Sequence, residues 1–240
     1  MGAETGGWFY VETDQRKAIS GSLNMNVNVV FERANAIYSF NPALTFRGSD
    51  RMDLSVGPSF SNRTEPQQFV ANRAVDGAAE FVRGQITQRT AAMTFRLNYT
   101  FSPTLSLQLY GQPFIASAAY QDFTHVADPA ETSYAERFTA LTGDQLTYDA
   151  VAGQYRVDLD GDGTAEYGFA NPDFNVRQFQ SNVALRWQYN PGSTVFVVWS
   201  SGRSSGMSDG SFSLGRDLGE LFRAAGTNTF LVKVSYWIGR

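Results

Sequence analysis

The sequence predicts an all-β fold, specifically an antiparallel transmembrane β-barrel of the outer-membrane type, of which these residues form the C-terminal portion. The first observation is an alternation of apolar and polar residues with a period of two, clearest in the stretch Met93–Tyr110. The second is length, because several alternating arms run for about ten residues, enough to cross a bilayer at barrel tilt. The third is an unequal distribution of short and long connections. We expect one β-barrel domain over residues 1–240.

Composition narrows the class of protein. Charged residues make up 18% of the chain, below the roughly 25% of an ordinary soluble domain, and aromatic residues make up 14%. The net charge of -4, with no basic stripe, argues against nucleic acid as a partner. No apolar run is long enough for a transmembrane helix, whereas alternating strands produce no hydropathy peak. The absence of cysteine excludes disulfides and thiolate metal sites. The first residues, MGAETGGWFY, lack a signal-peptide pattern, so an exported protein would carry this chain as part of a longer precursor.

The Met93–Tyr110 stretch is the best-defined hairpin of the first half. Its two arms meet at Ser102-Pro103-Thr104, where proline removes a backbone donor and favours a turn. Upstream, residues 22–31 alternate clearly and place three asparagines on one face, which suits a hydrated interior. Further strands are expected at 7–13, 37–47, 52–60, 67–71 and 81–88. In the hairpin we expect Leu97, Tyr99, Leu107 and Leu109 to face lipid, and Arg96, Asn98 and Gln108 to face a polar lumen.

The alternation stops after Phe114 and resumes at Phe174. Asp128-Pro129, followed by apolar residues at helical spacing up to Leu141, predicts a short amphipathic helix. A hairpin over 145–157 should lead into the segment DLDGDGTAEYGF. The remaining chain predicts strands at 174–189, 195–199 and 230–238 and a helix around 217–224. The total is about eleven strands, an odd number for a bacterial barrel, so further strands are expected before Met1.

The connections between strands differ in length at the two expected ends of the barrel. Two insertions, 119–173 and 204–228, should lie at one end. Outer-membrane barrels have short periplasmic turns and long external loops. We therefore expect both insertions to be external. The short connections should all lie at the periplasmic end, at 14–17, 48–50, 74–78, 102–104 and 190–193.

Three segments carry a resemblance to a known family: FRLNYTFSPTLSLQLYGQPF, DLDGDGTAEYGFANPDFNVRQFQSNVALRWQYNPGSTVFVVWSSGR and the terminal NTFLVKVSYWIGR. The chain resembles the C-terminal barrel domain of unknown function in bacterial outer-membrane proteins that also carry a carbohydrate-binding family 9 domain. The resemblance runs from GGWFYVETDQRK to the end of the chain. It implies an outer-membrane barrel whose upstream part carries further strands and a sugar-binding β-sandwich. Some members of the family are described as hydrolases, a role that none of these residues supports.

The segment Asp158-x-Asp160-x-Asp162-Gly163 is the strongest candidate metal site. Carboxylates at positions one, three and five with glycine at six open a calcium loop, and Glu166 falls at position nine. Position twelve is Phe169, so the loop is not a complete helix-loop-helix calcium site. The sequence therefore predicts a Ca²⁺ site formed by Asp158, Asp160, Asp162 and Glu166. A metal-free Asp/Gly turn at a solvated loop tip remains the alternative.

Two other groups of polar residues are candidate sites. His125 is the single histidine and follows Asp122, but no nucleophile-elbow sequence is present, so we assign no catalytic and no cofactor-binding residue. Five arginines are expected on polar strand faces, where they would favour anionic solutes in a lumen. Internal pairing with Asp53 or Glu80 is the alternative for Arg47, Arg83, Arg96, Arg177 and Arg186.

Aromatic residues near strand ends predict an interfacial girdle that anchors the barrel in lipid. Stacking on sugars in a cleft is the other role open to them. These residues are Trp8, Trp187, Tyr189, Trp199, Tyr236 and Trp237.

The function expected from these features is that of a bacterial outer-membrane β-barrel, acting as a membrane anchor or as a solute channel. Its partners would be the lipid bilayer and, through an absent N-terminal module, a saccharide. Two alternatives stay open at this point. One is an outer-membrane hydrolase with its site in the external loops, and the other is a soluble β-sheet binding protein.

Overall fold

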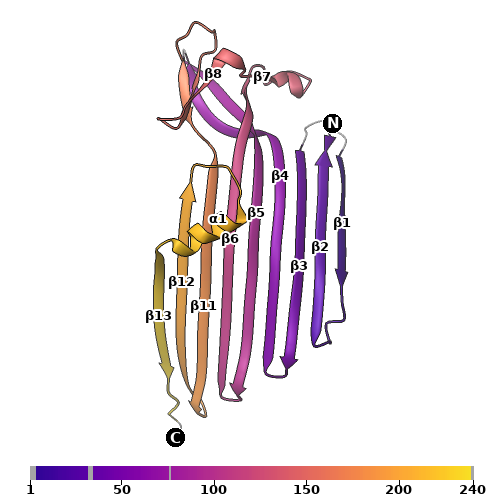
Figure 1. Cartoon of the computed structure of the whole chain (residues 1–240), viewed down its shortest axis with the longest axis vertical. Helices are drawn as coiled ribbons and strands as arrows, with labels where there is room; N and C mark the ends of the chain where they lie inside the picture. Colours follow the sequence, from indigo (N-terminus) through magenta and orange to yellow (C-terminus); the bar gives the residue numbers. More distant parts are fainter. Residues whose placement is uncertain (1–3, 32–34, 76, 239–240) are drawn as a thin grey trace.

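A computed structural model of the chain describes residues 4–31, 35–75 and 77–238. Its main feature is one long antiparallel sheet in which nine strands follow one another as neighbours (Figure 1). The strands are β1 (Glu4–Glu12), β2 (Ile19–Val30), β3 (Asn35–Ser49), β4 (Met52–Val75), β5 (Ala78–Ser102), β6 (Leu105–Val126), β11 (Phe174–Asn190), β12 (Ser193–Met207) and β13 (Gly226–Ser235).

The predicted all-β antiparallel fold is confirmed, but a closed barrel is not observed. Within the described residues β1 pairs only with β2 and β13 pairs only with β12, so the sheet is open at both edges. All residues of β1 and β13 are exposed to solvent. In the described part of the chain, no helix is long and apolar enough to span a membrane.

Strands β4 and β5 are much longer than the sequence pattern indicated. They contain 24 and 25 residues, and the segments 67–71 and 81–88, expected as separate strands, are their upper halves. The pairing of these two strands shifts register between Glu65 and Gln68 and again between Phe69 and Ala71. Such bulges disturb the alternation locally, which explains why the pattern seemed to break into short strands.

The continuity of β4 changes the end at which one connection lies. The turn between β4 and β5, expected at the end of the other short connections, lies at the opposite end, beside the insertions (Figure 1). Residue 76 of this turn lies outside the described residues. The other short connections share one end of the sheet, as predicted, and both insertions leave from the other end. The 190–193 turn requires glycine at position 192. Its φ is 75°, and an added Cβ would lie 2.8 Å from the Trp237 Cβ.

The first insertion forms a small domain that we term the cap, residues 127–173. It contains β7 (Phe138–Ala140), which pairs with β6, and a second sheet of β8 (Leu146–Asp149), β9 (Gln154–Val157) and β10 (Tyr167–Ala170). The expected hairpin over 145–157 is therefore present. The insertion was expected to begin at 119, but β6 continues to Val126.

The helix expected between Asp128 and Leu141 is absent, and this prediction was wrong. The segment contains one 3₁₀ turn, Ala135–Arg137, and then enters β7, while a second 3₁₀ turn follows at Gly143–Gln145. Pairing of Phe138 with Val126 holds the chain extended, so tertiary contacts override the helical spacing. The aromatic pair that suggested the helix does interact, with ring centroids of Tyr134 and Phe138 5.3 Å apart.

The cap has its own hydrophobic core, which joins it to the upper ends of β4, β5 and β6. Phe123 of β6 lies 5.2 Å from Phe169 of β10 and 4.8 Å from Tyr155 of β9, measured between ring centroids. Val82 and Val157 are fully buried beside them. The cap is thus fixed to the sheet through one aromatic cluster.

The second insertion carries the predicted helix, α1 (Leu214–Arg223). Strand β12 continues to Met207 and β13 begins at Gly226, so this insertion is shorter than the expected 204–228. Helix α1 crosses β6, β11 and β12 on one face of the sheet (Figure 1).

Candidate functional site

The most extensive chemical feature of the molecule is the difference between the two faces of its sheet. Directly paired residues of an antiparallel sheet lie on the same face. Following the pairing from β2 to β13 gives one row that is hydrophobic throughout: Ile19, Phe46, Leu54, Leu97, Leu109, Val183, Trp199 and Phe230. One residue further along each strand, the opposite face carries a row of polar residues: Ser20, Thr45, Ser55, Arg96, Tyr110, Asn182, Ser200 and Thr229.

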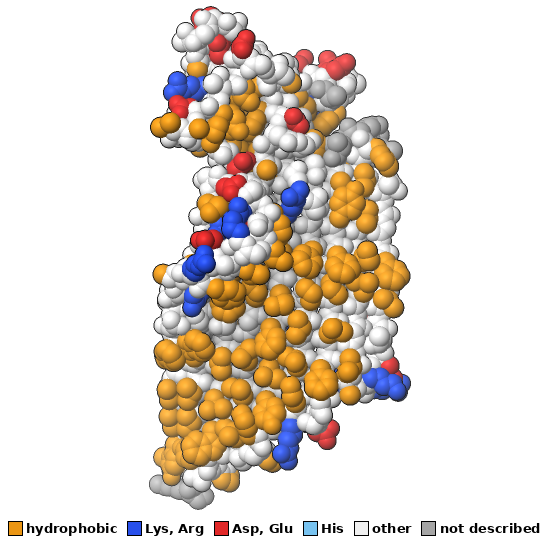
Figure 2. Space-filling model, in the orientation of Figure 1, with side chains coloured by type: hydrophobic (Ala, Val, Ile, Leu, Met, Phe, Trp, Pro, Cys, Tyr) orange, Lys and Arg blue, Asp and Glu red, His pale blue; other side chains and the backbone are white. Residues whose placement is uncertain are grey.

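The apolar face forms a band with definite limits. Near the short turns it begins with the paired residues Leu105, Trp187, Val195 and Val234. On β3 to β6 it ends toward the cap with Phe40, Phe60, Ala91 and Ile115, because the next row of the same face contains Asn62, Arg89 and Ser117. On β11 to β13 it is interrupted after Val183, Trp199 and Phe230, because the next row there is Ser181, Ser201 and Asn228. Figure 2 shows this face, with hydrophobic side chains over most of the sheet and charged groups near α1, the cap and the short turns. The pairing places Leu97, Tyr99, Leu107 and Leu109 on it, as predicted.

Helix α1 lies on the apolar face and buries an ion pair against it. The Arg177 Nε lies 3.6 Å from the Asp217 Oδ1, and the two side chains are 2% and 0% exposed. Asp217 also accepts hydrogen bonds from the Ser213 backbone and from Arg216. Next to this pair an apolar pocket of about 220 Å³ separates the helix from the sheet, lined by Phe60, Ile115, Leu214, Leu218 and Phe222 among others.

The position of Arg177 corrects a prediction, since it was expected on the polar face. The register of β11 places it on the same face as Val183 and Leu185. A cation on an apolar face needs a partner, which α1 supplies. Neither Asp217 nor the helix-sheet contact was foreseen. The sequence contained one signal that Arg177 lies on the apolar face. Its number is odd, and most other odd-numbered residues of β11 are apolar.

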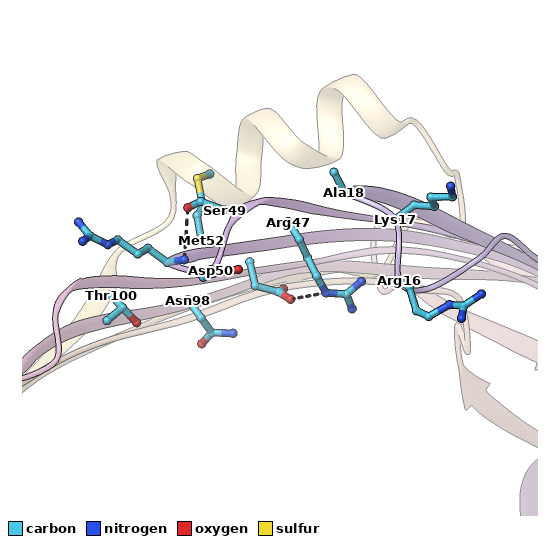
Figure 3. Close-up of a pocket in the computed structure, with 11 residues that line it drawn as sticks. Arg16, Lys17, Ala18, Arg47, Ser49, Asp50, Met52, Asn98 and Thr100 are labelled. Atoms are coloured by element: carbon cyan, nitrogen blue, oxygen red, sulfur yellow. Dashed lines mark hydrogen bonds and ion pairs between the residues drawn. The ribbon is translucent and has the colours of Figure 1, made fainter.

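The polar face is the concave one and carries several hollows. Figure 3 shows Arg47, Asn98 and Thr100 on the side of the sheet that faces away from α1, toward the inside of the arc formed by the strands. Arg47 Nε lies 3.2 Å from Asp53 Oδ2, and its Nη1 donates to the Gln15 carbonyl at 2.6 Å. The alternative of internal pairing is therefore correct for Arg47. A hollow of about 460 Å³ surrounds this pair near the short turns.

The other arginines of the expected set differ in their surroundings. Arg96 and Arg186 lie exposed on the polar face. Arg83 lies at the cap, where its Nη1 donates to the Gln67 carbonyl and its guanidinium lies 5.9 Å from the Phe138 ring centroid. It does not pair with Glu80, which instead contacts His125.

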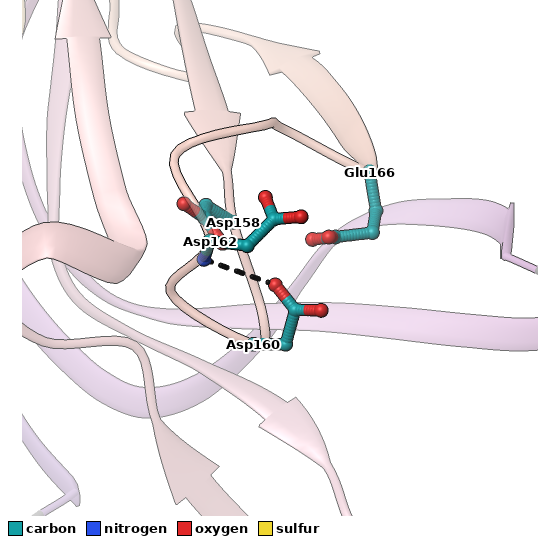
Figure 4. A group of neighbouring side chains, drawn as sticks. All are labelled: Asp158, Asp160, Asp162 and Glu166. Atoms are coloured by element: carbon teal, nitrogen blue, oxygen red, sulfur yellow. Dashed lines mark hydrogen bonds between the residues drawn. The ribbon is translucent and has the colours of Figure 1, made fainter.

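The acidic loop of the cap connects β9 to β10 and brings the four predicted ligands together (Figure 4). One carboxylate oxygen from each of Asp158, Asp160, Asp162 and Glu166 lies within 4.8 Å of the others, so the group could hold a metal ion. Asp158 is the least exposed of the four. Its two oxygens accept the backbone N–H groups of Gly161 and Gly163, at 2.6 and 2.8 Å.

The loop is flanked by strands, so a helix-loop-helix calcium site is excluded. Position twelve, Phe169, is buried in the cap core and stacks on Tyr155 with the ring centroids 5.1 Å apart. Glu166 closes the loop because its Oε2 accepts the Leu159 N–H at 2.6 Å. A Ca²⁺ ion binds oxygens at 2.3–2.6 Å, so two ligands on opposite sides of it are about 4.6–5.2 Å apart. The spread of the four oxygens fits that size.

The histidine and the tryptophans occupy less uniform positions than expected. His125, for which no catalytic role was expected, has its Nδ1 3.3 Å from Glu80 Oε2. Trp187 and Trp199 lie on the apolar face, and Trp187 packs on Tyr189 with centroids 6.0 Å apart. Trp8 pairs with Asn26 and therefore lies on the polar face, which removes it from an apolar girdle. Trp199 lies in the middle of β12, not at a strand end.

Comparison with known families places the chain in one of them. Residues 1–239 match the model of a family described as Domain of unknown function (DUF5916). No curated protein matches the chain. The match confirms the domain of unknown function that the resemblance implied, while the carbohydrate-binding module and the outer-membrane location stay predictions.

Proposed function

The chain belongs to the DUF5916 family, and we propose that its sheet forms part of a bacterial outer-membrane β-barrel, with the apolar face toward lipid and the polar face toward a water-filled interior. The observation that carries this proposal is the pair of adjacent rows, one hydrophobic and one polar, that continue across eight strands. Lipid-facing and interior-facing residues alternate in this way along the strands of membrane barrels.

The height of the apolar band supports a bilayer as the partner of this face. On β6 the band extends from Leu105 to Ile115. Ten residue steps at about 3.4 Å give roughly 34 Å along the strand. With a strand tilt of about 35–45°, the band would be roughly 24–28 Å high, close to the apolar height of about 25 Å in outer-membrane barrels. On β11 to β13 the hydrophobic rows are interrupted after Val183, Trp199 and Phe230, so this height describes the strands up to β6.

The two edges of the sheet support completion by further strands. Both edges carry large exposed hydrophobic residues, among them Trp8 and Phe9 on β1 and Phe230 and Val232 on β13. Open edges of this kind would promote aggregation unless they are paired. Strands β1 and β13 are the first and ninth of an antiparallel series, so they run in the same direction. Antiparallel closure therefore needs an odd number of additional strands, which we expect to come from outside these 240 residues.

The proposed barrel would anchor the protein and could pass a solute along its polar face. The insertions would lie outside the cell and the short turns in the periplasm, as for other outer-membrane barrels. A link to saccharides would depend on the additional module that the resemblance implies.

The absence of cysteine allows a direct test of which face meets lipid. Leu107 and Gln108 are neighbours in β6 on opposite faces. A nitroxide label on Leu107→Cys should be accessible to oxygen but protected from a water-soluble nickel chelate in lipid vesicles, and a label on Gln108→Cys should behave in the opposite way. Leu97→Cys and Asn98→Cys provide a second matched pair on β5. Equal access of the chelate to both faces, or a monodisperse protein without detergent, would refute the membrane assignment.

We further propose that the acidic loop binds Ca²⁺ in the cap. Four carboxylates within 4.8 Å repel one another unless a cation or protons intervene. Calorimetric titration should detect binding of calcium to the wild-type chain, and Asp160→Ala should weaken it at least tenfold. Asp144→Ala, an acidic residue of the cap outside the loop, is the control. Absence of heat at millimolar calcium in the wild-type chain would refute the site.

One observation favours the hydrolase alternative enough to justify a test. Asp173 lies in the first insertion and Asp209 in the second. Burial raises the pKa of Asp173, and the negative charge of Asp209 raises the pKa of Asp173 further. Hydrogen bonds from Ser211 lower the pKa of Asp209. Carboxyl groups with pKa values shifted apart can act as acid and base. Hydrolysis of chromogenic glycosides that disappears in both Asp173→Asn and Asp209→Asn would establish this function. Activity that survives either substitution would exclude the pair.

A further inference from the structure

The charges of the polar face are unevenly distributed over its strands. One part of the sheet contains no aspartate or glutamate. It consists of the lower part of β5, of β6 without its end near the cap, and of β11, β12 and β13, and it covers residues 90–118, 174–207 and 226–235. Their basic residues divide between the two faces. Arg177 and Arg203 lie on the apolar face, where Arg177 pairs with Asp217 of α1 and Arg203 donates to the Phe222 carbonyl of α1. The other three, Arg96, Arg186 and Lys233, lie on the polar face.

These three cations have no acidic partner in the described part of the chain. Arg96 is exposed, and its guanidinium lies 5.5 Å from the centroid of the Tyr110 ring, a neutral partner that leaves its charge in place. Arg186 is also exposed. It shares a row with Lys233, separated by Phe196 of β12, so the two backbones lie about 10 Å apart. Their charges add, because no carboxylate lies between them.

The first four strands differ in this respect. On their polar face Arg47 pairs with Asp53 at 3.2 Å, and Arg63 pairs with Glu65 at 3.1 Å. Strand β1 adds Glu4 and Glu12 without any cation. The polar face is thus positive over the lower parts of β5 and β6 and over β11 to β13, and neutral to negative over β1 to β4.

A hollow beside Arg96 would allow a solute to use this charge. It has a volume of about 520 Å³ and is lined by Arg96, Asn98, Gln108, Tyr110 and Asn182 among others. A second hollow of about 450 Å³ shares Tyr110 and Asn182 with it and continues across β11 and β12. Side-chain amides can donate hydrogen bonds, and a guanidinium binds carboxylate, phosphate and sulfate groups through paired N–H donors.

We infer that the polar face of β5, β6, β11, β12 and β13 is an anion-selective surface that takes a small solute bearing a carboxylate, phosphate or sulfonate group near Arg96. The inference rests on the proposed water-filled interior and names the class of solute that this interior favours. Charged side chains along a pore select ions of the opposite sign.

Single cysteines can measure the local potential directly. Asn182 and Asn24 are exposed asparagines on the same face, one in the positive half and one beside Tyr10 in the other half. Each is replaced by cysteine in the refolded chain, and its rates of reaction are measured with two thiosulfonate reagents, one carrying a sulfonate and one a quaternary ammonium group. At about 10 mM salt, where charges act over about 30 Å, we expect the ratio of sulfonate to ammonium rates to be roughly threefold to tenfold higher for Asn182→Cys.

Charge-removing substitutions assign the effect to the three cations. Arg96→Gln, Arg186→Gln and Lys233→Gln together should reduce the ratio at Asn182→Cys to that of Asn24→Cys. Arg223→Gln removes the same charge from the exposed side of α1, where the arginine is 79% exposed, and should leave the ratio unchanged. Equal ratios at the two cysteines, or a ratio unaffected by the triple substitution, would overturn the inference. If Asn182→Cys reacts with neither reagent while Leu107→Cys reacts with both, the assignment of the two faces in the proposed function fails instead.

Discussion

Arg177 of β11 and Asp217 of α1 form an ion pair that is almost completely buried, on the face of the sheet that otherwise carries hydrophobic residues. The Arg177 Nε also donates to Asn175 Oδ1 at 2.9 Å, and the Asn175 amide donates to the Ser211 carbonyl at the start of the helix segment. These contacts fix the position of α1 on the sheet.

Removing the carboxylate of Asp217 should release the helix. Asp217→Ala leaves the Arg177 charge buried without its partner, a change that typically costs about 3–5 kcal/mol. We expect α1 to lose protection from hydrogen exchange while β4 and β5 keep theirs. Glu220→Ala, on the same helix but with an exposed pair to Arg223, is the matched control and should change stability by less than about 1 kcal/mol. Unchanged protection of α1 in the Asp217 variant would contradict this account of how the helix is held.

The tryptophans provide a second test of the proposed membrane location. Trp199 lies in the hydrophobic row and stacks on Phe230, with the ring centroids 6.1 Å apart, whereas Trp8 lies on the polar face. In variants that keep one tryptophan each, lipids brominated near the middle of the acyl chain should quench Trp199 strongly and Trp8 weakly. Trp187, nearer the short turns, should respond best to bromines near the headgroup. Stronger quenching of Trp8 than of Trp199 would invert the assignment of the two faces.

Tyr167 should make the cap sensitive to high pH. Burial raises its pKa to about 12, with smaller contributions from the charges of Glu80 and Glu166, and its hydroxyl has no hydrogen-bond partner among the described residues. Because the pKa in the folded cap lies above that of an exposed tyrosine, near 10, its contribution to stability is complete below pH 10 and is lost as the pH rises from about 10 to 12.

The measurement is a base titration of cap folding, followed by near-ultraviolet circular dichroism. Tyr167→Phe should keep the cap folded to higher pH and should cost little at pH 7, because the hydroxyl that it removes is unpaired. Tyr148→Phe removes an exposed tyrosine from the same small sheet and should leave the transition unchanged. A transition at the same pH in wild type and Tyr167→Phe would rule out this residue as its origin.

The sheet could be predicted from the sequence because each strand repeats the same local rule. The alternation in Met93–Tyr110 identified both faces and the turn at Pro103, and the observed register pairs Leu97 with Leu109 and Tyr99 with Leu107. The prediction failed where this rule is interrupted. The bulges near Gln68 and Gly84 hid the continuity of β4 and β5, and this error also placed the turn after Val75 at the wrong end.

The sites depended on contacts between distant segments, which local patterns do not contain. The four acidic residues were found because they lie within nine positions of one another, so the loop itself brings them together. Asp217 and Arg177 are 40 positions apart, and only the return of the second insertion over the apolar face brings them together. The expected helix after Asp128 failed for the same reason, since pairing with β6 decided its conformation.

The aromatic core of the cap yields a prediction that separates cap folding from sheet folding. Phe169 is 2% exposed and lies against Phe123 and Tyr155, so Phe169→Ala should cost the cap about 3–5 kcal/mol through lost burial and a cavity. The sheet shares only the upper ends of its strands with this cluster and should remain folded. Limited proteolysis should then cut within residues 127–173 and leave the strands below intact. Val151→Ala, at a fully exposed position of the cap, should leave the digestion pattern unchanged.

The Phe169→Ala variant should also lose calcium binding, because the acidic loop joins β9 to β10 and depends on the core that holds these strands. A variant that kept full calcium affinity would show that the loop folds without the core beneath it.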